Sequence, residues 1–166
     1  MPSPREVIYV DTNVVLEAQR TGCLLDILER FDVRTVEMVR IEIQTGDQRR
    51  EGYVTVDMEE FSAKTTINRV TDVQLLQAAS RAPSLPALDP GERDLLALVA
   101  SENPRSLLLT TADKAAVKTA CQLGLGDRLI SLEEIAGQCG KNPALKKHYS
   151  KAWLGQVRAE FLFDTL

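Results

Sequence analysis

The feature that most constrains the fold is the alternation of short apolar runs with longer stretches of helical periodicity. Residues 6–10 and 106–110 are runs suited to buried strands, and helix-forming residues follow each of them. Further short strands are predicted at residues 33–39, 53–58 and 127–130. Parallel strands need long, usually helical, crossover connections. The alternation therefore predicts an α/β fold, a three-layer α/β/α sandwich around a mainly parallel sheet of four to five strands.

Helices are predicted in the stretches between these strands. They cover residues 14–31, 40 to about 50 (ending near Gly52), 59–81 as one or two helices, 89–101, 112–124 and 131–138. Asp89 can cap the helix at 89–101, with Pro90 in its first position and Glu92 three residues after the cap. Ser131 and Glu134 have the same capping-box spacing, and residues 143–163 form an amphipathic or mixed tail.

The length and composition predict one globular domain, residues 1–166, outside the membrane. A chain of 166 residues with 44% hydrophobic and 27% charged residues can bury one substantial core. Its apolar runs are far shorter than the roughly 20 residues of a membrane span. Because the first ten residues also lack the pattern of a secretory signal, we expect a cytoplasmic protein.

The cysteines, the histidine and the overall charge argue against several classes of site. Cys23, Cys121 and Cys139 are widely spaced, so we expect reduced, packed thiols rather than disulfides or a zinc site. His148 lies in a basic stretch without a nearby nucleophile and is predicted to be a surface side chain. A net charge of −4 leaves the partner open, although clustered cations could contact phosphates locally, namely Arg49, Arg50, Lys146, Lys147 and Lys151.

Carboxylates follow the predicted strands at the edge where α/β folds collect ligands. Asp11 directly follows the first strand, Glu42 lies in the helix after the second, and Asp113 follows the strand at 106–110. The helix start "PGERD" adds Glu92 and Asp94. Four separate segments are thus expected to bring carboxylates to one edge of the sheet.

Each of these acids also has a structural interpretation as a helix cap, a dipole-compensating acid or a solvated helix residue. Convergence favours a binding site instead, because like charges gathered at one edge repel one another unless a cation is present. Oxygen ligands without cysteine or histidine select Mg²⁺ or Mn²⁺, and Mg²⁺ commonly meets substrate phosphates. The pattern therefore favours phosphoryl chemistry.

Four segments resemble the PIN-domain nucleases in order and separation. They are "VIYVDTNVVLEA" from residue 7, "RIEI" around Glu42, "GERDLLALVA" from residue 91 and "LLLTTADKAAV" from residue 107. The resemblance covers about residues 6–135 as a PIN-like core and leaves a C-terminal helical extension, about residues 136–166, unmatched. Many members of this family are toxins of toxin–antitoxin pairs, similar to the virulence-associated protein C type, and cleave RNA with Mg²⁺ or Mn²⁺.

The resemblance implies a set of catalytic and metal-binding carboxylates with two polar supports. The carboxylates are Asp11, Glu42, Asp94 and Asp113, with Glu92 as a further metal ligand, and the supports are Asn13 and Thr111. We rank Asp94 above Glu92, because helix capping already accounts for Glu92. The implied partners are an RNA substrate, a cognate antitoxin protein and a second copy of the chain in a homodimer, with no membrane.

Two other functions fit the same residues. One is a PIN-like module that no longer cuts and that binds RNA or another protein. The other is a phosphate-receiver domain, in which Asp57 at the end of the predicted strand 53–58 would be phosphorylated. The chain lacks the adjacent acids that a receiver domain carries after its first strand, which argues against that function.

Overall fold

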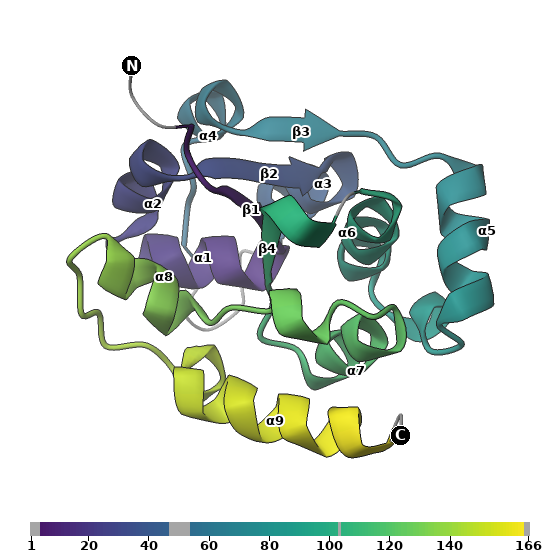
Figure 1. Cartoon of the computed structure of the whole chain (residues 1–166). Coiled ribbons are helices and arrows are strands. Elements are labelled where there is room, and N and C mark those ends of the chain that lie inside the picture. Colours follow the sequence, from purple (N-terminus) through teal and green to yellow (C-terminus); the bar gives the residue numbers. More distant parts are fainter. Residues whose placement is uncertain (1–3, 47–53, 103, 165–166) are drawn as a thin grey trace.

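The computed structural model describes residues 4–46, 54–102 and 104–164, and its architecture confirms the predicted fold class. The described strands form a parallel sheet in the order β3-β2-β1-β4, with helices packed around it (Figure 1). These strands are β1 (Val7–Val10), β2 (Asp32–Val36), β3 (Thr66–Asn68) and β4 (Leu107–Thr110). The sheet therefore has four strands, the lower number of the predicted range.

The helices connect these strands and extend beyond the last of them. The α-helices are α1 (Thr12–Arg20), α2 (Leu24–Arg30), α3 (Glu37–Thr45), α4 (Met58–Lys64), α5 (Asp72–Arg81), α6 (Pro90–Ser101), α7 (Lys114–Gln122), α8 (Leu132–Gln138) and α9 (Lys151–Asp164). Short 3₁₀ helices are η1 (Leu85–Ala87), η2 (Pro104–Ser106), η3 (Gly126–Arg128) and η4 (Lys147–Tyr149). In Figure 1, α9 runs beside α7 and α8 at the bottom of the view.

Strand β1, an inner strand, and its neighbour β4 at the edge of the sheet place the candidate site. Ile8, Val10 and Leu109 are buried, as expected for strands covered on both faces. Strand β1 pairs with β4 in register, from Val7 opposite Leu107 to Val10 opposite Thr110. The two strands consequently end side by side, and the residues that follow them emerge at the same edge of the sheet.

The direction of the crossovers changes along the sheet. The connections from β1 to β2 and from β2 to β3 move one way across the sheet, whereas the connection from β3 to β4 returns past both. Right-handed crossovers in opposite directions lie on opposite faces, and α6 in the returning connection packs against β1 and β2. The change of direction next to β1 is the position where open α/β sheets bind ligands.

The helix predicted at 14–31 is two helices in the structure. Gly22 has a φ angle of +79°, a conformation that most residues avoid, and the chain turns there between α1 and α2. Helix α1 also begins earlier than predicted, at Thr12, because the Asp11 side chain caps it. The apolar periodicity was read correctly on both sides of the turn, but the glycine ends the helix.

The region between β2 and α5 contains the largest errors of prediction. Residues 54–57 of the predicted strand 53–58 belong to no strand, while Tyr53 lies outside the described residues. Asp57 instead caps α4, accepting a hydrogen bond of 3.1 Å from the Glu60 backbone N–H, so the receiver-domain interpretation of Asp57 is wrong. The third strand is Thr66–Asn68, inside the stretch predicted as helix 59–81. Its β-branched residues Thr66 and Ile67 favour an extended backbone.

Three other boundaries differ from the predictions. Strand β2 ends at Val36 rather than at residue 39, because the helix predicted from residue 40 already begins at Glu37. That helix ends at Thr45 with Gly46 as its C-cap, and the predicted remainder, residues 47–50, lies outside the described residues. The segment 127–130 contributes only an isolated bridge from Leu129 to Leu109, following η3, and forms no strand.

Other expectations agree with the structure. The capping box of α8 forms as predicted, with the Ser131 hydroxyl accepting from the Glu134 N–H and the Glu134 carboxylate accepting from the Ser131 N–H. The cysteines are free, and Cys23 and Cys121 are buried. Among the helices of the described residues, none combines the length and apolar character needed to cross a membrane.

Candidate functional site

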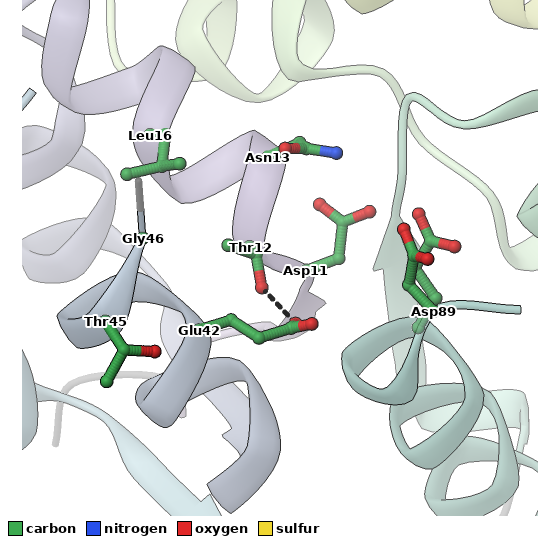
Figure 2. A pocket seen from close by; sticks show the side chains of 9 residues that line it. Asp11, Thr12, Asn13, Leu16, Glu42, Thr45, Gly46 and Asp89 are labelled. Carbon is green, nitrogen blue, oxygen red and sulfur yellow. Dashed lines mark hydrogen bonds between the residues drawn. The ribbon is translucent and has the colours of Figure 1, made fainter. Parts of the chain in front are cut away.

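An acidic pocket lies at the carboxyl edge of the sheet, where β1 ends. It encloses about 330 Å³ and is lined by Asp11, Thr12, Asn13, Leu16, Glu42, Thr45, Gly46, Asp89 and Glu92 (Figure 2). Four of these residues are acidic, and among the described residues that line it none is basic. The lining comes from the end of β1, the start of α1, the end of α3 and the start of α6. Of the four acid-bearing segments that the sequence predicted to meet, the lining thus includes those of Asp11, Glu42 and Glu92.

Asp11 is held at the centre of this edge by two hydrogen bonds. Its Oδ1 accepts from the Val14 N–H at 2.9 Å, which caps α1, and its Oδ2 accepts from the Thr111 hydroxyl at 2.7 Å. The side chain is 1% exposed. Burial, with the nearby charges of Asp113 and Glu42, raises its pKa to about 6, although both hydrogen bonds oppose the rise. Asp11 is therefore a cap, as the structural interpretation held, but each oxygen keeps a lone pair for a further partner.

Glu92 lies in the first turn of α6 and is 8% exposed. No hydrogen bond or ion pair to its carboxylate is present within the described residues, although it lines the pocket. Burial raises its pKa to about 8, and the charges of Asp113, Asp11, Asp89 and Glu42 add to the rise. Ionisation of a largely buried carboxylate without a partner is costly, so Glu92 is a candidate for contact with a ligand in this pocket.

Glu42 reaches the pocket from α3 and is fixed by two contacts. Its Oε1 accepts a hydrogen bond of 2.8 Å from the Thr12 hydroxyl, drawn as a dashed line in Figure 2. On the other side it lies against Gly91, where an added Cβ would overlap Oε1 and lie 2.9 Å from Cδ. Gly91 is thus the residue of α6 that leaves room for the carboxylate, and Thr12 sets its orientation.

Asp113 and the two predicted polar supports lie around Asp11. Asp113 caps α7 by accepting 2.9 Å from the Ala116 N–H, and its charge raises the pKa values of both Asp11 and Glu92. It does not line the pocket itself. Asn13 lines the pocket, and Thr111 donates to Asp11. The structure therefore brings Asp11, Glu42, Glu92, Asn13 and Thr111 together, with Asp113 as a nearby charge.

Asp94, like Asp113 and Thr111, is a predicted site residue that does not line the pocket. Its carboxylate accepts a hydrogen bond of 3.1 Å from Arg93 Nε in an ion pair. Residues two apart on a helix point in different directions, so Asp94 and Glu92 cannot share one face of α6. Glu92, which the sequence ranked below Asp94, is the one of these two acids that lines the pocket.

Five residues of the lining were not predicted as site residues, namely Thr12, Leu16, Thr45, Gly46 and Asp89. Asp89 is the N-cap residue of α6 and Pro90 is its first residue, as predicted. The predicted capping box with Glu92 does not form, since the Asp89 side chain makes no capping hydrogen bond and lines the pocket instead. Thr12 lies in the segment "VIYVDTNVVLEA" but is not one of the predicted site residues. Its contact with Glu42 joins residues 30 positions apart, which no local pattern indicates.

The pocket suits a hard divalent cation in its chemistry. Its charged lining groups are all carboxylates, and neither cysteine nor histidine is among the described lining residues. Asp89 and Glu92 line the same pocket as Asp11 and Glu42, and no basic side chain is among its described lining residues. In the described residues, however, no three acidic, thiol or imidazole side chains already stand close enough together to hold a metal ion. A cation would have to draw these carboxylates together.

Fold and site together define an α/β/α domain with an acidic, solvent-open pocket at the carboxyl edge of a parallel sheet. A comparison of the chain with protein-family models matches none of them, and a search of curated proteins finds no significant match.

Proposed function

We propose that this chain is a metal-dependent ribonuclease that hydrolyses RNA phosphodiester bonds at the acidic pocket. The observation that carries the proposal is that Asp11, Glu42 and Glu92 arrive from three separate segments to line one pocket without a basic side chain among its described lining residues. The resemblance of the same segments to the PIN-domain nucleases supports RNA as the substrate, in the manner of a toxin of a toxin–antitoxin pair.

The residues of the pocket have distinct roles in this proposal. Asp11, Glu42 and Glu92, with Asp113 beside them, would hold one or two Mg²⁺ or Mn²⁺ ions. Such an ion supplies an acidified water and stabilises negative charge on the phosphate. Thr111 and the Val14 N–H fix the Asp11 carboxylate, and Thr12 fixes that of Glu42. Without a cation, Glu92 keeps its proton at neutral pH because its pKa is about 8.

The test is cleavage of a labelled RNA by the full chain with Mn²⁺, with Mg²⁺ and with a chelator. We expect cleavage only with a divalent ion, and a loss of about 100-fold or more in Asp11→Asn, the size of effect seen when a main electrostatic contact of a reaction is removed. Asp57→Asn is a matched control, since Asp57 caps α4 as Asp11 caps α1 but lies outside the pocket lining. Cleavage that continues in the chelator, or unchanged in Asp11→Asn, refutes the proposal.

A second function, a PIN-like module that binds RNA or a protein without cutting, is favoured by one observation. The described residues contain no group of three side chains already arranged to hold a metal ion. Titration of the chain with Mn²⁺, followed by electron paramagnetic resonance, separates the two functions. Saturable Mn²⁺ binding that Glu92→Gln weakens supports the nuclease, and RNA binding without any Mn²⁺ binding supports the module.

The remaining partners stay predictions from the resemblance. A cognate antitoxin protein would be encoded beside this chain, and a homodimer would have twice the mass of 18.4 kDa in light scattering. A cytoplasmic location is likewise an expectation, checked by fractionating cells that express the chain.

A further inference from the structure

The C-terminal extension carries cations and aromatic rings that the proposed chemistry does not use. We define the basic–aromatic strip as Lys146, Lys147, His148, Tyr149 and Trp153, which span the residues before η4, η4 itself and the start of α9. Lys146 and Lys147 are exposed, and within the described residues neither ammonium group has an ion-pair partner. The chain has a net charge of −4, so these cations are a local exception.

The strip is fastened to α1, the helix whose first turn lines the acidic pocket. The Lys146 N–H donates to Glu17 Oε2 at 2.8 Å, and Arg20 Nη2 donates to the Ala144 carbonyl at 3.3 Å. Glu17 is 4% exposed and is also bound by Arg20, so its contact with the Lys146 backbone is partly buried. The strip therefore has a fixed position on the domain, although about 130 residues separate it from α1 along the chain.

One contact joins the strip to the pocket itself. The Tyr149 hydroxyl donates a hydrogen bond of 3.3 Å to the carbonyl oxygen of Asn13, and Asn13 lines the pocket. Residues 146–149 consequently lie one side chain away from the rim.

The rings of the strip form a small cluster. The His148 ring lies 4.3 Å from the Tyr149 ring between centroids, and 6.4 Å from the Trp153 ring at an edge-on angle of 71°. His148 and Trp153 are both partly exposed. Planar side chains flanked by cations are the combination that binds single-stranded nucleic acid, because bases stack on the rings and phosphates contact the cations.

We propose that the basic–aromatic strip binds single-stranded RNA beside the acidic pocket, with Lys146 and Lys147 on phosphates and a base stacked on the His148–Trp153 cluster. The inference rests on the proposed function, because it names the surface that holds the substrate of that reaction. The pocket repels phosphates by its own charge, so a polyanion needs cations elsewhere to stay bound. An acidic protein would also meet the lysines, but it would make no use of the rings.

The test measures RNA binding in a chelator, where no metal-dependent cleavage occurs. Trp153 is the only tryptophan of the chain, so its fluorescence reports directly on the strip. We expect a short unstructured RNA to change this fluorescence. Lys146→Glu with Lys147→Glu should weaken binding at least about tenfold and reduce the slope of log affinity against log salt by about 1.4, the value for two phosphate contacts of a single strand.

A double variant of equal charge, Lys64→Glu with Lys118→Glu, is the matched control, because both lysines are exposed and lie on α4 and α7. The RNA affinity of this control should stay within about twofold of that of the unchanged chain. The proposal is overturned if the control weakens binding as much as the strip variant, or if RNA leaves the Trp153 fluorescence unchanged. Intact binding without Mn²⁺-dependent cleavage would refute the proposed reaction alone, and cleavage that is indifferent to the strip variant would refute the strip alone.

Discussion

Replacing Glu92 by glutamine should stabilise the metal-free protein at alkaline pH. The folded-state pKa of Glu92 is about 8 and its ordinary value is 4.5, so the folded chain holds this proton more tightly than the unfolded chain. The stability that the proton contributes is complete below the unfolded pKa and is lost as the pH rises through the folded pKa. Glutamine never ionises, and it therefore removes this dependence.

The size of the effect follows from the pKa difference. Between about pH 5 and pH 8 the unfolded chain has released the Glu92 proton while the folded chain still holds it, which lowers the free energy of unfolding by up to about 4 kcal/mol, at about 1.4 kcal/mol per pH unit. Water in the open pocket screens the neighbouring carboxylates, so we expect about half of this, roughly 2 kcal/mol. For a chain of this length, the melting temperature of Glu92→Gln at pH 8 should be about 4–8 °C above that of the unchanged chain.

The assay is thermal unfolding followed by circular dichroism at about pH 5 and at about pH 8, with a chelator present. Glu60→Gln is the matched control, since Glu60 is the third residue of α4 after its cap Asp57, as Glu92 is the third residue of α6 after Asp89. The melting temperatures of Glu92→Gln and the unchanged chain should agree near pH 5 and diverge at pH 8, whereas Glu60→Gln should show no such divergence. Equal melting temperatures of Glu92→Gln and the unchanged chain at pH 8 would refute the reasoning about an uncompensated acidic pocket.

Three further substitutions, and one control, test other parts of the structure. Gly91→Ala should displace the Glu42 carboxylate and weaken Mn²⁺ binding measured by electron paramagnetic resonance. The control is Gly155→Ala in α9, where no atom lies within 4 Å of the new Cβ, and which should raise the free energy of unfolding by about 0.5–1 kcal/mol. Equal Mn²⁺ affinity in the two variants would contradict the role of Gly91. Ser131→Ala should cost about 1 kcal/mol in urea unfolding through loss of the α8 cap, and no loss would contradict it. Burial raises the pKa of Glu17, but its hydrogen bonds and nearby cations lower that pKa by more, so the folded-state pKa lies below the ordinary value of 4.5. The stability that the ionised Glu17 contributes is therefore present above pH 4.5 and is lost as the pH falls through the folded-state pKa. Glu17→Gln should therefore destabilise the chain by about 1–3 kcal/mol at neutral pH and by less in acid, measured by urea unfolding.

The sequence predicted best where burial and chain direction act together. Asp11 and Thr111 directly follow two buried apolar runs, and paired parallel strands bring such positions to one edge. That reasoning needs only the apolar pattern and the alternation of strands with helices. It placed the acidic edge correctly without any knowledge of the contacts between side chains.

The rest depends on features that local patterns do not contain. Strand β3 has three residues, too few for a periodic signal, and it is stabilised by pairing with β2. The choice between Glu92 and Asp94 depends on the rotation of α6, which its packing against the sheet decides. Asp89 has the spacing of a cap, and only the tertiary structure turns its side chain toward the pocket.

The hydrogen bond between Thr111 and Asp11 has a consequence for the order of folding. It joins residues 100 positions apart, and the β1–β4 pairing beneath it spans the same length of chain. Contacts of such long range form late, because the intervening chain must be brought together first. During synthesis from the N-terminus, Asp11 is present long before its partner. A chain that ends before β4 leaves one edge of β1 unpaired, and the acidic pocket takes its final form only when most of the protein has been made.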